Sequence, residues 1–456
     1  MSSALTVAQT AIPGLFLIDL PLHGDERGWF KENWQRAKMT SLGLPDFHPV
    51  QQNVAFNAEV GVTRGVHAEP WDKLVSVVSG RIFGAWVDLR EGDSFGHVVT
   101  LELGPEKAVF VPRGVGNAYQ TLEPGTTYSY LVNEHWSESA RDSYTFLNAA
   151  DPAVGITWPI PLERSTRSAA DLGHPALADV TPFAPRRTVI LGGEGQLGRA
   201  LARTIPSAEV FSRRELDLTA PQDFDWSGVG TIINAAAYTA VDAAEAERAA
   251  AWAVNVTGVR KLVGIAREHR ATLVHVSSDY VFDGTQEVHT EEEPLSPLSF
   301  YGVTKAAGDE LVATWDRHYI VRTSWVIGDG KNFITTMASL AERGIEPSVV
   351  DDQHGRLTFT DTLAEGIAHL LASGATFGTY NLTNSGPQMT WAEVAKAVFR
   401  ECGRADGAVK PVTTAEYFLG RDMAPRPDHS TLDLGKISAA GFVPPPPPAG
   451  LRIAES

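Results

Sequence analysis

Tyr301 and Lys305 are the residues whose types and spacing point most directly to chemistry. They lie four positions apart, so a helix would place both side chains on one face. A tyrosine with a pKa of about 10 is a poor acid-base catalyst at neutral pH, but a neighbouring ammonium group favours the tyrosinate and lowers that pKa. Ser278 follows an apolar segment and could hold a substrate oxygen. These side chains predict proton transfer to a carbonyl oxygen as hydride arrives, although such a pair alone is also typical of an ordinary helix face.

Hydride transfer requires a cofactor, and a glycine fingerprint for one lies earlier in the chain. Residues 192–198 read Gly-Gly-Glu-Gly-Gln-Leu-Gly, behind the apolar run 189–191 and ahead of a helix-forming stretch, 196–203. One glycine permits a tight turn, one lets the backbone approach a pyrophosphate, and one lets the helix pack on the strand. We therefore expect a dinucleotide site rather than an ordinary glycine-rich turn. Its expected contacts come from Gly192, Gly195, Gln196, Leu197 and Gly198.

The residues after the second predicted strand bear on the identity of the cofactor. An acidic residue there would accept the ribose hydroxyls of NAD, whereas this chain has Ser212-Arg213-Arg214. Two guanidinium groups suit a 2′-phosphate. The sequence therefore favours NADPH, with NADH still open, because arginines on exposed loops are commonly just solvated.

The elements that must position these residues change in kind near residue 185. Before it, short alternating segments separated by glycine and proline are typical of an antiparallel sandwich or jelly roll. Residues 179–186 have the composition of a linker. Beyond it, apolar strands alternate with helical stretches, which predicts a parallel, doubly wound sheet. The expected segments are strands at 73–78, 81–89, 97–103, 108–111 and 127–132, then strands at 231–234, 272–277 and 319–324 and a helical region at 240–269.

Length, charge and cysteine content narrow the class of protein. At 456 residues the chain exceeds what one hydrophobic core usually supports, so we expect two domains, 1–184 and 187–456. The net charge of −17 argues against a nucleic-acid or membrane surface. We find no pattern of a signal peptide and no run of the roughly 18 apolar residues that a membrane helix needs. The single cysteine, Cys402, fits a reducing cytoplasm.

Further segments of the second half carry a resemblance to a known family. They are 216–219, 234–242, 279–284, 322–326, 352–355 and 426–427. Together with the fingerprint, they make residues 187–436 similar to the extended short-chain dehydrogenase/reductase superfamily, and closely to its dTDP-4-dehydrorhamnose reductase branch. The resemblance implies that Ser278, Tyr301 and Lys305 are the catalytic trio, with Lys305 also gripping the nicotinamide ribose. It further implies that Trp325 and Arg426 line the sugar-nucleotide site, and that the cofactor is contacted by Asp217, Leu218, Ala235, Ala236 and Ala237.

Two properties of this branch leave alternatives open. Some members bind Mg²⁺ through glutamates at a dimer interface, and Glu291, Glu292 and Glu293 could correspond to them, although an exposed charge run is the more ordinary interpretation. A regulatory subunit of methionine adenosyltransferase resembles the same branch and works as a binding module. The intact Tyr301 and Lys305 argue against that role here.

A second resemblance covers residues 1–180. The segments that carry it are 25–32, Gln51 and Asn53, 64–67, 73–80 and 87–90. They make this region similar to the dTDP-4-dehydrorhamnose 3,5-epimerase family, a cupin jelly roll. The resemblance implies that His67 is a catalytic base and that Asp171, in a Ser-x-x-Asp-x-x-x-Pro segment, orients it. By the same resemblance Lys73 stabilises an enolate oxygen and Tyr130 returns a proton from the opposite face.

These residue types suit the inversion of a carbon beside a ketone. A proton next to a C4 ketone is weakly acidic, so its removal needs a positioned base and a group that holds the enolate charge. A carboxylate bound to a histidine ring fixes its tautomer and raises its basicity. Metal-binding cupins instead offer paired histidines plus a glutamate. Because no His-x-His occurs in this chain, we expect an acid-base site without a metal.

The first half also departs from the family pattern in several places. Residues 68–72 form a shorter loop than usual, and Gly84 stands where an aspartate would pair with the lysine. Asn117 replaces a histidine, and Trp136 replaces a tyrosine that packs near the base, so Trp136 is expected against the substrate. The remaining substrate contacts implied by the resemblance are Arg27 and Arg64 for the diphosphate, and Glu32, Gln51 and Asn53 for the nucleotide.

The two resemblances together predict a bifunctional enzyme. Its first half would invert the carbons that flank a 4-ketone, and its second half would reduce that ketone with NADPH, so that dTDP-4-keto-6-deoxyglucose becomes dTDP-L-rhamnose. Two alternatives stay open: a first half that is non-catalytic or inverts one carbon, and a different dTDP- or UDP-linked deoxysugar as product. A homodimer is expected, since both families commonly form dimers.

Overall fold

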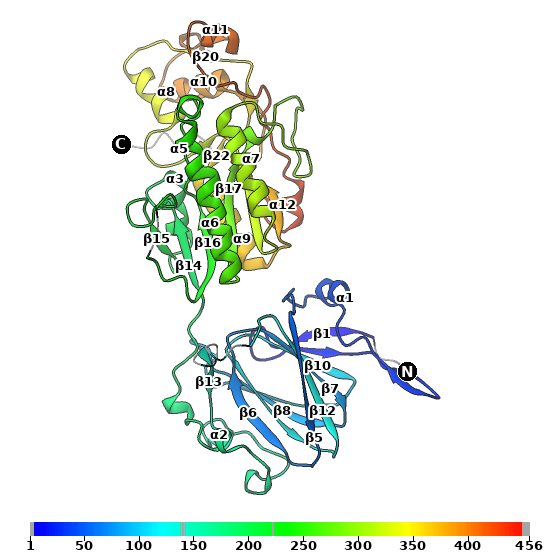
Figure 1. Cartoon of the computed structure of the whole chain (residues 1–456). Helices are drawn as coiled ribbons and strands as arrows, with labels where there is room; N and C mark the ends of the chain where they lie inside the picture. The colour runs from blue at the N-terminus through cyan, green and yellow to red at the C-terminus, as the bar shows by residue number, and fades with distance from the viewer. Residues whose placement is uncertain (1–3, 137, 139–140, 142, 221–222, 449–456) are drawn as a thin grey trace. The chain divides into compact units, whose positions relative to one another are not determined.

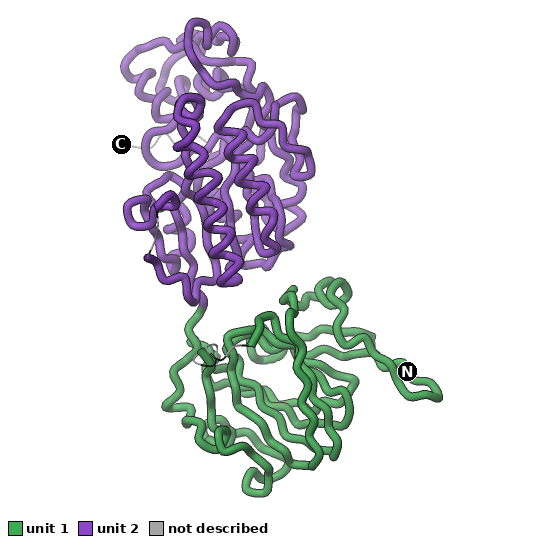
Figure 2. Tube along the Cα trace, viewed as in Figure 1, with its two compact units in different colours: residues 1–185 green, residues 186–456 purple. Residues whose placement is uncertain are grey.

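The computed structural model describes residues 4–136, 138, 141, 143–220 and 223–448. The chain divides into two compact units, residues 1–185 and residues 186–456 (Figure 2). Each unit has hydrophobic cores of its own. The predicted linker lies at this boundary, but Phe183 already pairs with Arg90 of the first unit, so the first unit continues almost to Pro185.

The N-terminal unit is built from two antiparallel sheets (Figure 1). The first has the order β1 (Thr6–Gln9), β2 (Phe16–Asp19), β10 (Lys107–Val111), β7 (Lys73–Ser79), β12 (Thr126–Val132), β5 (Gln51–Asn57). The second has the order β13 (Thr145–Phe146), β6 (Thr63–Ala68), β11 (Val115–Thr121), β8 (Ile82–Asp88), β9 (Val98–Leu103). This arrangement confirms the antiparallel jelly roll predicted from the alternating segments.

Strand periodicity decides which side chains of this unit face its interior. Val75 and Val77 of β7 pack with Trp86 of β8 in a core between the sheets. Val66 and Ala68 of β6 pack instead into a separate core behind the second sheet. Because successive side chains on a strand point to opposite faces, His67 faces the same interior as Val75 and Val77.

Short elements complete the first unit. They are the hairpin of β3 (His23–Asp25) and β4 (Gly28–Phe30), helix α1 (Arg36–Ser41), helix α2 (Ala169–Leu172), and 3-10 turns at Leu162–Arg164 and Leu177–Asp179. Helix α2 begins where the Ser168 side chain accepts a hydrogen bond from the backbone N–H of Asp171. This cap fixes the turn that carries Asp171.

The C-terminal unit contains a six-stranded parallel sheet, which confirms the doubly wound fold predicted for this half. Its order is β15 (Glu209–Phe211), β14 (Arg187–Leu191), β16 (Val229–Asn234), β17 (Thr272–Ser278), β18 (His318–Thr323), β23 (Gly378–Asn381). Helices α3 (Gln196–Thr204) and α9 (Thr360–Ser373) pack on one face through Ile190 and Ile233. Helices α6 (Val259–Glu268) and α7 (Phe300–Ala313) cover the other face through Val189 and Ile232 (Figure 1).

The region 240–269 is less regular than the sequence predicts. It contains α4 (Ala243–Ala246), α5 (Arg248–Trp252), a π-helical turn at Ala253–Gly258 and then α6. Within the π turn, the Asn255 side chain accepts a hydrogen bond from the Tyr238 backbone N–H and donates to the Tyr238 carbonyl and the Thr304 hydroxyl. These tertiary hydrogen bonds accompany the irregular turn, which alanine-rich composition alone does not reveal.

A smaller lobe follows the fifth strand of the sheet. Its helices are α8 (Phe333–Glu342), α10 (Trp391–Glu401) and α11 (Thr414–Phe418). Three two-stranded sheets accompany them: β20 (Ser348–Val350) and β25 (Lys410–Val412), β19 (Val326–Ile327) and β22 (Thr358–Phe359), and β21 (His354–Gly355) and β24 (Met389–Thr390). A 3-10 turn at Asp279–Val281 follows β17, another lies at Asp406–Ala408, and helix α12 (Gly435–Ala439) lies near the end of the described chain. Among the described residues, no helix has the length and apolar character needed to cross a membrane.

Candidate active sites

The turn from β14 into α3 is shaped by its glycines. Gly192 has a φ of +86°, and a Cβ there would lie 2.8 Å from the backbone nitrogen of Ala236. A Cβ on Gly198 would lie 2.1 Å from the Gly192 carbonyl oxygen, so this glycine lets helix α3 approach the strand. Gly195 caps the helix. A Cβ there would have one neighbouring atom within 4 Å, the Gly192 carbonyl oxygen at 3.1 Å. The turn therefore leaves an open helix N-terminus of the kind that binds pyrophosphate.

A cavity of about 1130 Å³ runs from this turn to the predicted catalytic residues. It is lined by most of the residues expected at the cofactor and the catalytic centre: Gly192, Gly195, Gln196, Leu197, Arg213, Asp217, Leu218, Ala235, Ala236, Ala237, Ser278, Tyr301, Lys305 and Trp325. Gly198, Arg214 and Arg426 do not line it. The cradle and its volume fit a dinucleotide together with part of a second ligand.

Ser278 and Tyr301 lie side by side at the end of strand β17, and Lys305 lines the same cavity one helical turn further along α7. Ser278 is the last residue of that strand, and Tyr301 and Lys305 lie one turn apart in the first half of α7. The Ser278 hydroxyl oxygen lies 2.8 Å from Asp279 and within hydrogen-bond reach of the Tyr301 phenol, and its contact with Tyr301 acts to lower the pKa of that phenol. The geometry therefore places a phenol and a hydroxyl side by side in the cavity, next to a carboxylate.

The expected lowering of the Tyr301 pKa is wrong for this structure. Burial is the largest influence and raises that pKa above its usual range, and the charge of Asp279 acts in the same direction. Lys305 directs its ammonium elsewhere, since its Nζ donates to the Val276 carbonyl at 2.7 Å. Burial lowers the pKa of Lys305 to about 8, against an opposing contribution from Asp309. Tyr301 is thus a protonated phenol at neutral pH, which is the form that a proton donor requires.

The two arginines expected at the cofactor's 2′-phosphate differ in position. Arg213 lines the cavity and pairs with Asp217 at 3.3 Å, with 76% of its side chain exposed. Arg214 is exposed and does not line the cavity. The Asp217 carboxylate also accepts hydrogen bonds from the backbone and hydroxyl of Thr219. Arg213 is therefore the one of the two that is placed to meet a ligand in this cavity.

Of the two residues expected around the sugar nucleotide, Trp325 lines the cavity and Arg426 does not. The ring of Trp325 lines the cavity and stacks on Trp391 at 3.7 Å, and a Cβ on Gly355 would lie 2.7 Å from the Trp325 ring. Trp391 was not predicted, because it begins a helix of the distant lobe. Arg426 instead pairs with Asp242, with Nη2 and Oδ2 2.9 Å apart. An ion pair therefore links segment 426–427 to segment 234–242.

The glutamates considered for Mg²⁺ point to different partners. Glu291 accepts a hydrogen bond from the Asn381 backbone, Glu292 lies 3.6 Å from Lys436, and Glu293 bonds the His289 ring. Within the described residues, the group able to offer three close metal ligands is a different one, in the N-terminal unit. Within one chain, the three glutamates therefore do not gather into a set of metal ligands.

A second cavity, of about 520 Å³, opens in the N-terminal unit. Of the residues expected at the epimerase site, Arg64, His67, Trp136 and Asp171 line it. Arg141 and Arg167 line it as well and were not predicted, since an arginine in a loop has no recognisable spacing. In a chain with a net charge of −17, three arginines around one cavity provide a local site for an anion.

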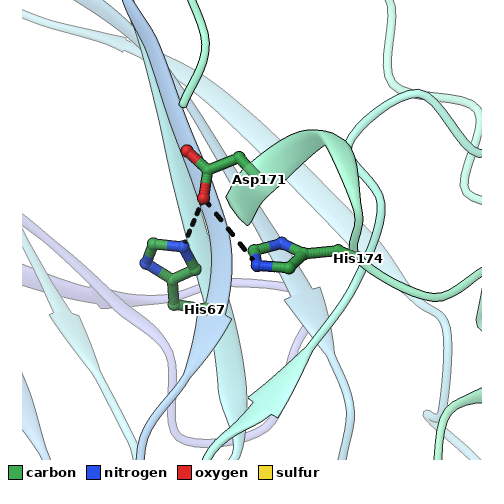
Figure 3. Close-up of side chains that lie close together, drawn as sticks. All are labelled: His67, Asp171 and His174. Atoms are coloured by element: carbon green, nitrogen blue, oxygen red, sulfur yellow. Dashed lines mark hydrogen bonds and ion pairs between the residues drawn. The ribbon is translucent and has the colours of Figure 1, made fainter. Parts of the chain in front are cut away.

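His67, Asp171 and His174 lie together in this cavity (Figure 3). The Nε2 atom of His67 lies 2.8 Å from Oδ1 of Asp171, and Nε2 of His174 lies 3.9 Å from the same oxygen. Figure 3 shows the two rings next to each other, each with a ring nitrogen directed toward that carboxylate. Their ligand atoms lie within 4.8 Å of one another, so a metal ion has potential ligands here too. His174 was not predicted, although it lies three residues beyond Asp171.

The charges of this group follow from burial and hydrogen bonding. Burial acts to raise the pKa of Asp171, but the hydrogen bond with His67 and other contacts outweigh it and leave that pKa below its usual value. Burial also lowers the pKa of His174, and the charge of His67 adds to this effect. At neutral pH the charged Asp171 carboxylate therefore lies beside both histidine rings. A proton held on Nε2 of His67 by Asp171 leaves Nδ1 as the basic nitrogen.

Lys73 and Tyr130 lie on the opposite sheet from His67. The Lys73 Nζ is 5.5 Å from the centre of the Tyr130 ring, and it forms an ion pair with Glu69. Burial raises the pKa of Tyr130, which keeps its phenol protonated. Neither residue lines the cavity. Arg64 does line it, and its charge acts to lower the pKa of Tyr130, against the larger effect of burial.

The residues expected at the nucleotide are spread over the unit. Gln51 and Asn53 share a hydrogen bond of 2.9 Å on β5, and Gln51 accepts another from the backbone of Trp136. Arg27 instead pairs with Asp25, and Glu32 pairs with Lys38, all on the exterior. Within one chain, the structure therefore brings Gln51 and Asn53 near the cavity and leaves Arg27 and Glu32 away from it.

Each unit matches the model of a known family. Residues 186–450 match the RmlD substrate binding domain, and residues 9–179 match dTDP-4-dehydrorhamnose 3,5-epimerase. The RmlC homolog of Streptococcus pyogenes is 48% identical over 180 residues, which cover 38% of this chain and 90% of that protein. The chain belongs to both families.

Relatives of the C-terminal unit are equally informative. The dTDP-4-dehydrorhamnose reductase of Aggregatibacter actinomycetemcomitans is 38% identical over 282 residues, which cover 57% of this chain and 94% of that protein. A crystal structure of the Bacillus anthracis dTDP-4-dehydrorhamnose reductase in complex with NADP is 33% identical, with a TM-score of 0.52 over 57% of this chain and 95% of that one. Both resemblances seen in the sequence are confirmed, and the chain carries a reductase domain and a 3,5-epimerase domain.

The position of Arg213 generates a prediction about cofactor binding. Replacing Arg213 with alanine should raise the KM for NADPH about tenfold, because a charge-assisted contact to the 2′-phosphate is lost. The KM for NADH should stay the same, since NADH lacks that phosphate. Arg214→Ala serves as the matched control and should leave both constants unchanged. Steady-state kinetics with each cofactor measure the effect, and equal changes for the two arginines would contradict this placement.

Proposed function

We propose that this chain converts dTDP-4-keto-6-deoxyglucose to dTDP-L-rhamnose in two steps, with residues 1–184 as the epimerase and residues 187–456 as the NADPH-dependent reductase. The observation that carries the proposal is the presence, in one chain, of a His67–Asp171 pair beside an arginine-lined cavity and of Ser278, Tyr301 and Lys305 beside a dinucleotide cradle. The relatives named above support the dTDP-linked keto sugar as the substrate.

In the first step His67 acts as the base. Its basic nitrogen takes the proton from a carbon beside the C4 ketone, and the electron pair of that C–H bond forms a C=C bond while the carbonyl π electrons move to oxygen. Asp171 holds the ring and stabilises the imidazolium that forms. Lys73 stabilises the negative oxygen, and Tyr130 returns a proton to the opposite face, which inverts the carbon.

The arginines of the cavity hold the rest of this substrate. Arg64, Arg141 and Arg167 bind the diphosphate, because a planar guanidinium group can donate two hydrogen bonds to phosphate oxygens. Trp136 packs against the sugar. Gln51 and Asn53, next to Trp136, bind the nucleotide.

In the second step the ketone is reduced. The backbone around Gly195 at the N-terminus of α3 would hold the pyrophosphate of NADPH and Arg213 its 2′-phosphate, and the bound cofactor would supply hydride. Tyr301 donates its proton to the carbonyl oxygen, and Ser278 holds that oxygen in line. Trp325 provides an apolar wall for the sugar. Protonation of the oxygen as hydride reaches C4 avoids a free alkoxide.

The cellular and quaternary setting follows from other features. A single cysteine, Cys402, and the absence of a membrane-spanning helix among the described residues support action in the cytoplasm. Val54 and Phe56 are 62% and 65% exposed on β5, an unpaired sheet edge, and support a homodimer.

Sedimentation velocity of the full chain tests the homodimer. The wild-type protein should sediment with the mass of two chains, and Phe56→Lys should shift it toward one chain, since a charge opposes pairing of that edge. Val443→Lys, at another exposed apolar position, is the control. A monomeric wild-type protein would contradict the proposal.

The role of His67 is tested by deuterium exchange. His67→Ala should slow uptake of deuterium from D₂O into C3 and C5 of the keto sugar by about 10²- to 10⁴-fold, because the base is lost. NMR of the sugar in the absence of NADPH measures the exchange at each carbon. His97→Ala, which removes an exposed histidine of the same unit, should exchange at the wild-type rate. Undiminished exchange in His67→Ala would sink the assignment.

The role of Tyr301 is tested separately from the first step. Tyr301→Phe should lower kcat for NADPH oxidation by about 10²- to 10⁴-fold, because the phenol that donates the proton is removed. Deuterium exchange at C3 and C5 should stay at the wild-type rate, since the other unit performs it, and the affinity for NADPH, followed by its fluorescence, should change little. A wild-type kcat in this variant would show that another group donates the proton.

A further inference from the structure

Lys73 places an ammonium group inside the N-terminal unit. Its side chain is 6% exposed, and it lies on the same face of β7 as the core residues Val75 and Val77. Burial lowers the pKa of this ammonium to about 7. A charge in such a position is retained only beside a partner of opposite sign. The identity of that partner decides whether Lys73 can act as a cation.

The partner expected from the epimerase family is missing, and the structure shows that it has no room. Position 84 holds glycine instead of the aspartate expected there. A Cβ on Gly84 would lie 2.4 Å from the ring of Trp86, which is fully buried between the sheets. The Trp86 ring thus occupies the space into which an aspartate at this position would project.

A different carboxylate meets Lys73. Glu69 begins the short turn between β6, which carries His67, and β7, which Lys73 begins. Its side chain is 10% exposed and forms an ion pair with the Lys73 ammonium. The turn is held in place because the Asp72 carboxylate accepts hydrogen bonds from the Arg113 backbone at 2.9 Å and from the Asn133 amide at 3.0 Å.

We propose that Glu69 is the positioning residue that holds the Lys73 ammonium in the interior of the epimerase unit, in place of the carboxylate that position 84 cannot supply. The inference rests on the proposed function, since it assigns Glu69 a task in enolate stabilisation. When His67 takes the proton, negative charge develops on the C4 oxygen, and an ammonium N–H donates to that oxygen. Glu69 keeps the group protonated and aimed, and it does not itself touch the substrate.

The other groups around Lys73 cannot replace Glu69. The titratable groups on the packed strands are Tyr130, whose ring centre lies 5.5 Å from the Lys73 Nζ, its neighbours Tyr128 and Tyr119, and Arg64 and His67 of β6. Burial raises the pKa of all three tyrosines, so they are neutral, and arginine has the wrong sign. Asp72 is engaged by backbone and amide donors. Among the described residues, Glu69 is the carboxylate that pairs with Lys73.

The pH dependence of deuterium exchange in the full chain tests this role. The rate should fall at alkaline pH as Lys73 loses its proton. In Glu69→Gln the loss of the anion lowers the Lys73 pKa, so this alkaline limb should move to lower pH by at least one unit, with a tenfold lower rate at pH 8. Glu69→Asp, which keeps the charge, should restore most of the wild-type profile. Glu102→Gln, an exposed control on β9, should match the wild type.

Titration of Lys73 itself gives a readout that does not depend on activity. With ¹³C-labelled lysine, the Lys73 signal, assigned from its loss in Lys73→Met, should titrate at lower pH in Glu69→Gln than in the wild type. A folded Glu69→Gln protein with an unmoved titration, or with a moved titration but an unmoved rate profile, overturns the inference. If Glu69→Gln does not fold, the rate profile of Glu69→Asp is the test. A profile close to the wild type supports the inference, and loss of deuterium exchange at every pH in Glu69→Asp overturns it. Absence of exchange in the wild type would instead refute the proposed function.

Discussion

Both candidate sites need ionisable side chains that stay charged although they are buried. Proton transfer to and from a keto sugar needs charged groups away from bulk water, and each such group must have a partner. In the first unit Asp171 is held charged beside His67, and Lys73 lies beside Glu69. In the second unit the buried Asp309 pairs with Arg322 at 3.1 Å and also acts on Lys305. The pair of His67 and Asp171 joins segments far apart in the chain, whereas Glu69 lies only four residues before Lys73.

The sequence predicted the elements well because their cause is local. Alternation of apolar residues located β7, β8, β9, β10 and β12 to within about two residues. The glycine fingerprint located the turn into α3, where Gly198 lets the helix touch the strand. Tyr301 and Lys305 did fall on one face of α7. In each case a few neighbouring residues determine the geometry, so spacing is enough to recognise it.

What the sequence did not predict depends on how the folded chain buries and pairs its charged groups. Glu69 lies four residues before Lys73 and His174 lies three residues after Asp171, but these short spacings do not show that the fold buries each pair. The pKa of Tyr301 rises rather than falls, because burial outweighs a lysine whose ammonium bonds a backbone carbonyl. Arg426 was expected at the substrate and pairs with Asp242 instead. Burial and pairing of charges are properties of the folded chain, and residue types alone do not disclose them.

One ketone serves both steps, which gives the two units a common chemical logic. The carbonyl acidifies the neighbouring carbons for inversion and then accepts hydride. NMR analysis of the product that the full chain forms in D₂O from dTDP-4-keto-6-deoxyglucose and NADPH tests whether both steps occur. The product should be dTDP-L-rhamnose with deuterium at C3 and C5 and protium at C4. A 6-deoxy sugar that retains protium and its original configuration at C3 and C5 would contradict this prediction.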